Sequence, residues 1–185
     1  MSAITLGVIA DTHIPDRAAQ VPLAALDLFA RNKVHAILHA GDLSVPRVLH
    51  QLAEVAPVHA IRGNTDVLLL GKLPWKRQLE FEGVSIGMVH GHGNWLKYIP
   101  NRIDYFLHGP KKFSYYEETA RHQLPGCQVV VCGHTHVPAN YWREGQLIFN
   151  PGSATKPNAV MASLPRSVGL LHLDQGNVRG EIVFI

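Results

Sequence analysis

The fold is decided by the stretch ITLGVIADTH, residues 4–13. Residues 4–11 begin as a short apolar run and end in a polar residue, which predicts a strand buried within a sheet. Asp11 and His13 stand at and just beyond the carboxyl end of that strand. Residues 21–32 have apolar residues on one helical face and Pro22 near the start, which predicts a helix. A strand followed by a helix indicates an α/β fold, in which ligands bind at the carboxyl ends of the strands.

The same alternation continues through residue 66. Strands are predicted at residues 35–40 and 58–61, and a helix at residues 45–55 with Ser44 as its N-cap. Each strand ends in polar residues, so three successive strand ends carry groups that can bind a ligand. The two further ends are Gly41-Asp42 and Arg62-Gly63-Asn64-Thr65-Asp66.

The second half of the chain follows a β-rich pattern. A hairpin is predicted at residues 78–89, with its turn at Glu82-Gly83, and a fully apolar strand at residues 128–132. Residues 140–150 and 167–185 alternate like the strands of further hairpins. The hairpin and the apolar strand lead into His90-Gly91-His92 and Gly133-His134-Thr135-His136.

Length and composition limit the class of protein. With 185 residues, 46% of them hydrophobic, we expect a single domain over residues 1–185. Neither a membrane-spanning segment of ~18 apolar residues nor a basic leader is evident, so no membrane association is expected. Cys127 and Cys132 make no disulfide framework, which favours the cytoplasm. The net charge of +3 comes from dispersed Lys and Arg, which permits contact with nucleic acid without supporting it.

Twelve histidines are unusual beside 14 acidic residues, and several of them stand at the predicted strand ends. Side chains at positions i and i+2 of an extended segment point the same way, so Asp-x-His and His-x-His spacings predict convergent groups. The resulting candidates are Asp11, His13, Asp42, Asn64, His90, His92, His134 and His136.

Such a set suits a pair of divalent cations. A carboxylate such as that of Asp42 can bridge two ions at ~3.5–4 Å, the spacing that two-metal hydrolases use. Imidazole-rich ligation favours transition ions over Mg or Ca. Two carboxylates against two dications leave a charge of about +2, which attracts phosphate and stabilises a phosphoryl transition state.

Taken in order, these motifs resemble the complete motif series of the calcineurin-like metallophosphoesterases. The short chain, together with Asn150-Pro151-Gly152-Ser153, resembles the small single-domain phosphodiesterases whose eukaryotic relative is a scaffold subunit of retromer. The resemblance implies a four-layer α/β/β/α sandwich of two mixed β-sheets flanked by helices. It also implies a metal-dependent phosphodiesterase with a dinuclear site at the sheet edge and a metal-bridging hydroxide as nucleophile.

By position, the resemblance also implies ligands for two divalent transition ions, with Mn first and Ni, Co, Fe or Zn as alternatives. Asp42 would lie between the two ions. Asp11, His13 and His136 would hold one ion, and Asn64, His90 and His134 the other.

One position departs from the family, because Thr65 stands where many members have a catalytic His. A threonine hydroxyl can bind a phosphate oxygen beside Asn64 but is a poor acid, so His92 is the candidate proton donor and substrate contact, with water as its rival. Asp66 is expected to support catalysis by orienting an imidazole or the Asn64 loop. The departure favours diesters over monoesters, and the expected substrate is a small phosphate ester or a nucleotide-like molecule.

Other interpretations stay open. Residues 94–126 are rich in aromatic and basic side chains and follow His92 directly. They could form a lid that stacks a base, or pack on the sheet or against a second subunit. The whole chain could also be a non-catalytic scaffold of the same fold, or a nuclease, which would require a continuous basic groove.

Overall fold

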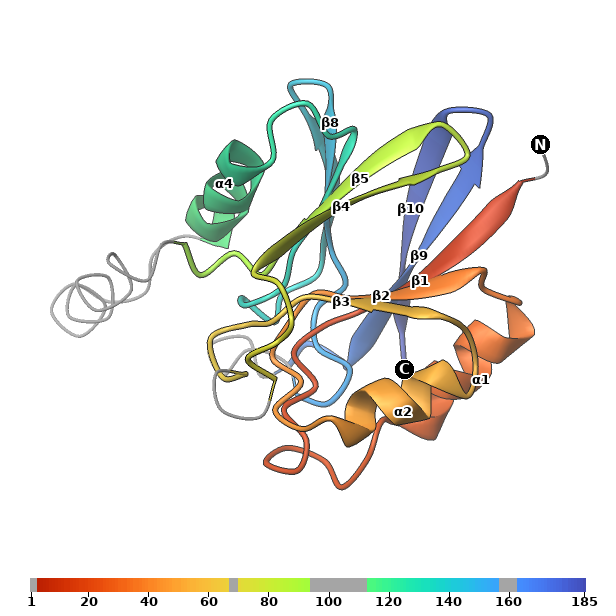
Figure 1. The fold of residues 1–185 in the computed structure, drawn as a ribbon, viewed down its shortest axis with the longest axis vertical. Coiled ribbons are helices and arrows are strands. Elements are labelled where there is room, and N and C mark those ends of the chain that lie inside the picture. Colours follow the sequence, from red (N-terminus) through yellow and green to blue (C-terminus); the bar gives the residue numbers. More distant parts are fainter. Residues whose placement is uncertain (1–2, 67–69, 94–112, 157–162) are drawn as a thin grey trace, which may run out of the picture.

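The computed structural model describes residues 3–66, 70–93, 113–156 and 163–185, and it contains two mixed five-stranded sheets (Figure 1). In the first sheet, parallel strands are extended on one side by an antiparallel hairpin. In spatial order this sheet contains β10 (Asn177–Phe184), β9 (Ser167–Asp174), β1 (Ile4–Ile9), β2 (Ala36–His39) and β3 (Val58–Ala60).

The second sheet has three parallel strands at its centre and one antiparallel strand at each edge. Its short central strand is uniformly apolar, as expected for a strand covered on both faces. In spatial order the sheet contains β4 (Lys76–Phe81), β5 (Val84–Val89), β6 (Val129–Val131), β8 (Gln146–Asn150) and β7 (Ala139–Arg143).

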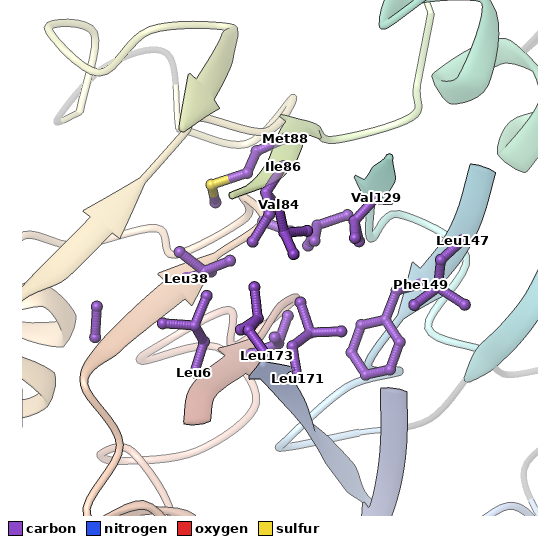
Figure 2. Close-up of a cluster of buried hydrophobic side chains, with 14 of the residues drawn as sticks. Leu6, Leu38, Val84, Ile86, Met88, Val129, Leu147, Phe149, Leu171 and Leu173 are labelled. Carbon is purple, nitrogen blue, oxygen red and sulfur yellow. The ribbon is translucent and has the colours of Figure 1, made fainter. Parts of the chain in front are cut away.

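The two sheets pack face to face over an apolar core. Alternate residues of each strand point inward, since strand side chains have a period of two. Figure 2 shows Leu6, Leu38 and Leu171 of the first sheet meeting Ile86 and Phe149 of the second.

Helices cover the outer faces. Helix α1 (Leu23–Arg31) and helix α2 (Arg47–Ala53) pack on the first sheet, where Phe29 lies over Gly7. A Cβ atom at Gly7 would stand 2.9 Å from the Phe29 ring, so only glycine allows this contact. Helix α4 (Phe113–Gln123) covers the second sheet. The expected four-layer α/β/β/α sandwich is therefore confirmed.

Along the chain an α/β half is followed by a β-rich half, as predicted, but the C-terminal hairpin completes the first sheet because β9 pairs with β1. One local prediction was wrong. Ser44 does not cap α2, which begins at Arg47 after Pro46. Ser44 instead has a φ of 73° and donates its backbone N–H to Asp66. Within the described ranges, no helix combines the length and apolar character that a membrane crossing requires.

Candidate metal centre

The loops after β1, β2, β5 and β6 are joined by backbone hydrogen bonds. The N–H groups of Asp11 and His13 donate to the carbonyls of Gly41 and Asp42, each at 3.0 Å. In the second sheet, Gly133 donates to the carbonyl of His90 at 3.1 Å. The carboxyl ends of strands from both sheets therefore carry their polar residues to one place.

Five of the seven candidate ligands have a left-handed backbone. Their φ angles lie between 42° and 69°, which costs a non-glycine residue of order 1–3 kcal/mol and concentrates at functional sites. The expected extended i, i+2 geometry is therefore wrong for the Asp11 and His134 loops, although their side chains do converge. The five residues are Asp11, His13, Asp42, His134 and His136.

A first group of three buried ligand atoms comes from Asp11, His13 and His136. The two imidazole Nε2 atoms lie 3.3 Å apart, and His136 Nε2 lies 3.4 Å from Asp11 Oδ1. The carbonyl of Lys156 is 2.9 Å from His136 Nδ1 and can accept its proton, which would leave Nε2 with a free lone pair. These three side chains could hold one cation.

A second group combines Asp11, Asp42 and His90. Asp42 Oδ2 lies 3.4 Å from His90 Nε2 and also 3.4 Å from His13 Nε2, so this oxygen faces both groups. His90 Nδ1 donates to the carbonyl of Ala40 at 2.8 Å, which turns Nε2 toward the carboxylates. Among the described residues, this buried Nε2 has no hydrogen-bond partner.

Asn64 and His134 adjoin the second group. His134 Nδ1 lies 3.1 Å from Asn64 Oδ1, and the backbone N–H of His134 donates to both oxygens of Asp11 at 3.0 and 3.2 Å. All seven predicted ligands are therefore brought together. Imidazole nitrogens together with carboxylate and amide oxygens fit a divalent transition ion. Within the described ranges, the buried Nε2 of His90 faces two carboxylates without a hydrogen bond, as a nitrogen that binds a cation would.

Burial sets the charges of this cluster. It raises the pKa of Asp11 to about 6, against the opposing influence of His136 and His90. Burial would also raise the pKa of Asp42, but His90 and His13 hold it well below its usual range. His90 shows the reverse balance, because Asp42 and Asp11 outweigh burial and raise its pKa to about 10. Without a cation, a proton on His90 compensates the buried carboxylates.

Asp66 and Thr65 lie behind the ligands. The buried carboxylate of Asp66 accepts backbone hydrogen bonds from Asp42, Gly63 and Ser44 at 2.7–2.8 Å. Of its two expected roles, this geometry favours orienting the Asn64 loop. Thr65 donates its backbone N–H to Asp42 Oδ1 at 3.0 Å while its side chain is exposed.

His92 stands between two candidate ligands and the aromatic side chain of Trp75. Its ring centroid is 5.5 Å from that of His90, 6.1 Å from that of His134 and 5.4 Å from that of Trp75. Burial, with help from the charge of His90, lowers the pKa of His92 to about 4. A neutral imidazole at neutral pH suits hydrogen bonding to a substrate better than proton donation. On the other side, the ring centroid of Tyr116 from α4 lies 5.0 Å from that of His134.

The residues that hold the loops in place were hardly predictable from the sequence. Asn150 donates to the carbonyl of Gly133 and to Thr135 Oγ1, each at 3.0 Å, and Ser153 donates to the carbonyl of Asp11 at 2.8 Å. The Asn-Pro-Gly-Ser motif pointed to this position only as part of the family resemblance. No sequence pattern pointed to Arg17, yet its Nη1 lies 2.8 Å from His136 Nδ1.

A separate open hollow of about 570 Å³ lies at the opposite end of the second sheet, near the amino end of β6. It is lined by residues such as Ser85, Arg121, Cys127 and Gln146. None of the candidate ligands belongs to it, so it has no part in the metal centre.

Comparison with known proteins agrees with this geometry. The model of the calcineurin-like phosphoesterase superfamily domain matches residues 4–176. A probable metallophosphoesterase of Methanothermobacter thermautotrophicus is 34% identical over 184 residues, covering 96% of this chain and 91% of the relative. A variant of Vps29 from Entamoeba histolytica has a similar fold, with a TM-score of 0.71 and 24% identity over 98% of this chain and 99% of that one. An archaeal phosphodiesterase has a TM-score of 0.65 and 18% identity, covering 97% and 100% of the two chains. The chain therefore belongs to the calcineurin-like phosphoesterase superfamily.

Proposed function

We propose that this protein is a phosphodiesterase that depends on two divalent transition ions. The observation that carries this proposal is the position of Asp42, whose Oδ2 lies 3.4 Å from an imidazole of each ligand group. A carboxylate shared between two groups of nitrogen ligands is what a bridging ligand requires.

The ligands divide as the family resemblance implies. The ion beside Asp11 would be held by His13 and His136, and the ion beside His90 by Asn64 and His134, with Asp42 shared. When bound, such ions lower the pKa of water so that hydroxide is available at neutral pH, and they neutralise charge on the phosphoryl group. Manganese is the first candidate, since mixed nitrogen and oxygen ligands without thiolates suit it, and Ni, Co, Fe or Zn are alternatives.

The chain's own residues would hold and orient the substrate. Asn64, exposed Thr65 and His92 border the ligands and offer an amide, a hydroxyl and a neutral imidazole to the phosphate oxygens. Asp66 would act by positioning, because its carboxylate fixes the Asp42 and Asn64 loops.

Preference for diesters follows from the lack of a strong acid. Family members with His at the position of Thr65 have a proton donor there, whereas a threonine hydroxyl is a poor acid near pH 7. His92 has a pKa of about 4, so it is mostly unprotonated there as well. Substrates whose leaving groups need little protonation, such as activated diesters, are therefore favoured over unactivated monoesters.

The scaffold and nuclease alternatives lack a specific supporting observation. Likeness to Vps29 at 24% identity shows the fold alone. All seven ligand positions hold residues able to bind a metal, which favours an enzyme. The lid interpretation of residues 94–126 stays a prediction, because residues 94–112 lie outside the described ranges.

Hydrolysis of bis(p-nitrophenyl) phosphate and p-nitrophenyl phosphate, each with a series of divalent ions, tests the proposal. Asp42→Asn should abolish diester hydrolysis, because the shared ligand loses its charge. Asp174→Asn, the same change at the exposed end of β9, is the matched control and should retain full activity. Diester hydrolysis that survives Asp42→Asn would count against the proposal.

A further inference from the structure

We propose that Trp75 and Arg62 form a subsite for a flat aromatic substituent of the phosphate ester, either a nucleobase or an aryl group. This subsite rests on the proposed function, because the metal centre beside it would hold the phosphoryl group. Neither residue is a candidate metal ligand.

Arg62 and Trp75 hold each other in a fixed arrangement. The guanidinium carbon of Arg62 lies 3.9 Å from the centroid of the indole ring. Its Nη1 donates to the carbonyl of Gly71 at 2.8 Å, and its backbone N–H donates to the carbonyl of Pro74 at 3.0 Å. These bonds tie the chain after β3 to the segment before β4. The indole is therefore fixed next to the loop that carries Asn64.

The indole also adjoins the metal centre through His92. The centroids of the two rings are 5.4 Å apart and their planes are inclined by 53°. His92 in turn lies 5.5 Å from His90 and 6.1 Å from His134. One imidazole thus separates the indole from two candidate ligands. A substituent attached to a phosphate at the centre would lie within reach of Trp75.

The exposure and charge of the pair define the chemistry of the occupant. Trp75 keeps 37% of its surface exposed although a guanidinium and an imidazole both contact it. A flat aromatic group can stack on this surface, and such stacking tolerates any base because every base has a π face. Arg62 adds a positive charge that favours an anionic ester and the electron-rich face of a ring. A small alkyl group would gain neither contact.

Calorimetric titration of the Mn²⁺-loaded protein with AMP and with methyl phosphate separates stacking from phosphate binding. The two ligands share the phosphate and differ in the nucleoside. Trp75→Ala should weaken AMP binding by about 5- to 150-fold and methyl phosphate binding by less than about twofold. Trp75→Phe keeps a flat ring and should restore most of the affinity for AMP.

Trp142→Ala is the matched control, because Trp142 is also exposed but lies in β7. It should leave both affinities unchanged. Arg62→Lys retains the charge without the planar contact, so it should weaken the binding of AMP more than the binding of methyl phosphate.

Each contrary result has a distinct meaning. Unchanged AMP affinity in Trp75→Ala would overturn the subsite. Equal losses for both ligands would overturn it too, since the indole would then only support His92. If the wild-type protein binds neither ligand, the proposed function fails together with the subsite. Binding of methyl phosphate without any preference for AMP rejects the subsite alone.

Discussion

The backbone N–H of Asp42 donates a 2.8 Å hydrogen bond to the buried carboxylate of Asp66. The same carboxylate oxygen accepts the N–H of Gly63 at 2.8 Å, so one side chain fixes two of the loops that carry candidate ligands. Asp42 has a left-handed backbone, and this pair of bonds opposes the cost of that conformation. The position of the shared ligand therefore depends on a residue that need not touch the substrate.

Replacement of Asp66 by Asn should loosen both loops. An amide has one acceptor oxygen, so at least one of the three backbone donors would face an N–H group. One buried unsatisfied group costs about 1–3 kcal/mol, and the midpoint of urea unfolding should fall accordingly. Metal affinity, measured by competition with a chelator, should fall as well. Asp174→Asn at an exposed position should change neither quantity, and an equally stable Asp66→Asn variant would show that the tether is unimportant.

Introducing the histidine that many family members carry should restore proton donation. Thr65 is exposed and uses only its backbone N–H toward Asp42, so Thr65→His should fold normally. We expect kcat/KM for phenyl phosphate to rise about 100-fold, the lower end of what a positioned acid contributes. The gain should be smaller for p-nitrophenyl phosphate, whose leaving group needs less protonation. Thr65→Ala serves as the control, and equal rates for Thr65→His and Thr65→Ala would refute the explanation.

Replacing Asn150 by Asp should destabilise the protein more than replacing it by Ala. Its amide group donates to Gly133 and Thr135, and its carbonyl accepts the N–H of Gly152 at 2.9 Å. Asn150→Ala should cost about 1–3 kcal/mol in the free energy of unfolding. Asn150→Asp should cost more, because it replaces a donor by a carboxylate facing the Gly133 carbonyl. Chemical denaturation measures both losses, with Asn177→Ala at the exposed start of β10 as the control. A larger loss in Asn150→Ala than in Asn150→Asp would contradict this account.

Glu117 lies away from the metal centre, and its ionisation should make the stability of the fold depend on pH. It is buried on α4 and accepts a 2.7 Å hydrogen bond from the hydroxyl of Tyr141. Burial raises the pKa of Glu117 above its ordinary value of 4.5, so the folded state keeps its proton at a pH where the unfolded state has lost it. Stability is therefore lost as pH rises from the unfolded pKa to the folded pKa, and it stays lower above that window.

Glu117→Gln should remove this dependence. The free energy of unfolding of the variant, relative to the wild type, should increase as pH rises through the window and then level off. Denaturation curves at several pH values measure the difference, and Glu54→Gln at an exposed site is the control. A difference that does not vary with pH would show that Glu117 ionises equally in both states.

Much of the fold could be predicted because its strands are short apolar runs bounded by turns. Residues 4–11 and 128–132 contain strands that are covered on both faces, and their composition shows it. The pairing of β9 with β1 could not be predicted, since it joins residues about 160 positions apart and depends on how two sheets pack. Helix α2 begins at Arg47 rather than at residue 45, and Ser44 instead donates its backbone N–H to Asp66, which is remote in sequence.

The residues of the candidate site could be predicted from the sequence, but their geometry could not. The order of motifs predicted seven ligands, and the structure brings these seven residues together. The reason first given for their convergence was wrong in part, because Asp11, His13 and His136 have left-handed rather than extended backbones. Such conformations are imposed by contacts such as those of Asp66 and Ser153, which come from distant parts of the chain. The contact of Trp75 with His92 was unpredictable for the same reason.

Metal content and diester hydrolysis, measured on the same preparation before and after chelation, test the central claim most directly. Elemental analysis should find a divalent transition metal in the purified protein. Chelation should remove this metal and abolish hydrolysis of bis(p-nitrophenyl) phosphate, and Mn²⁺ should restore the rate in the wild type but not in His136→Ala. Full diester hydrolysis by protein that retains no metal in excess chelator would contradict the account.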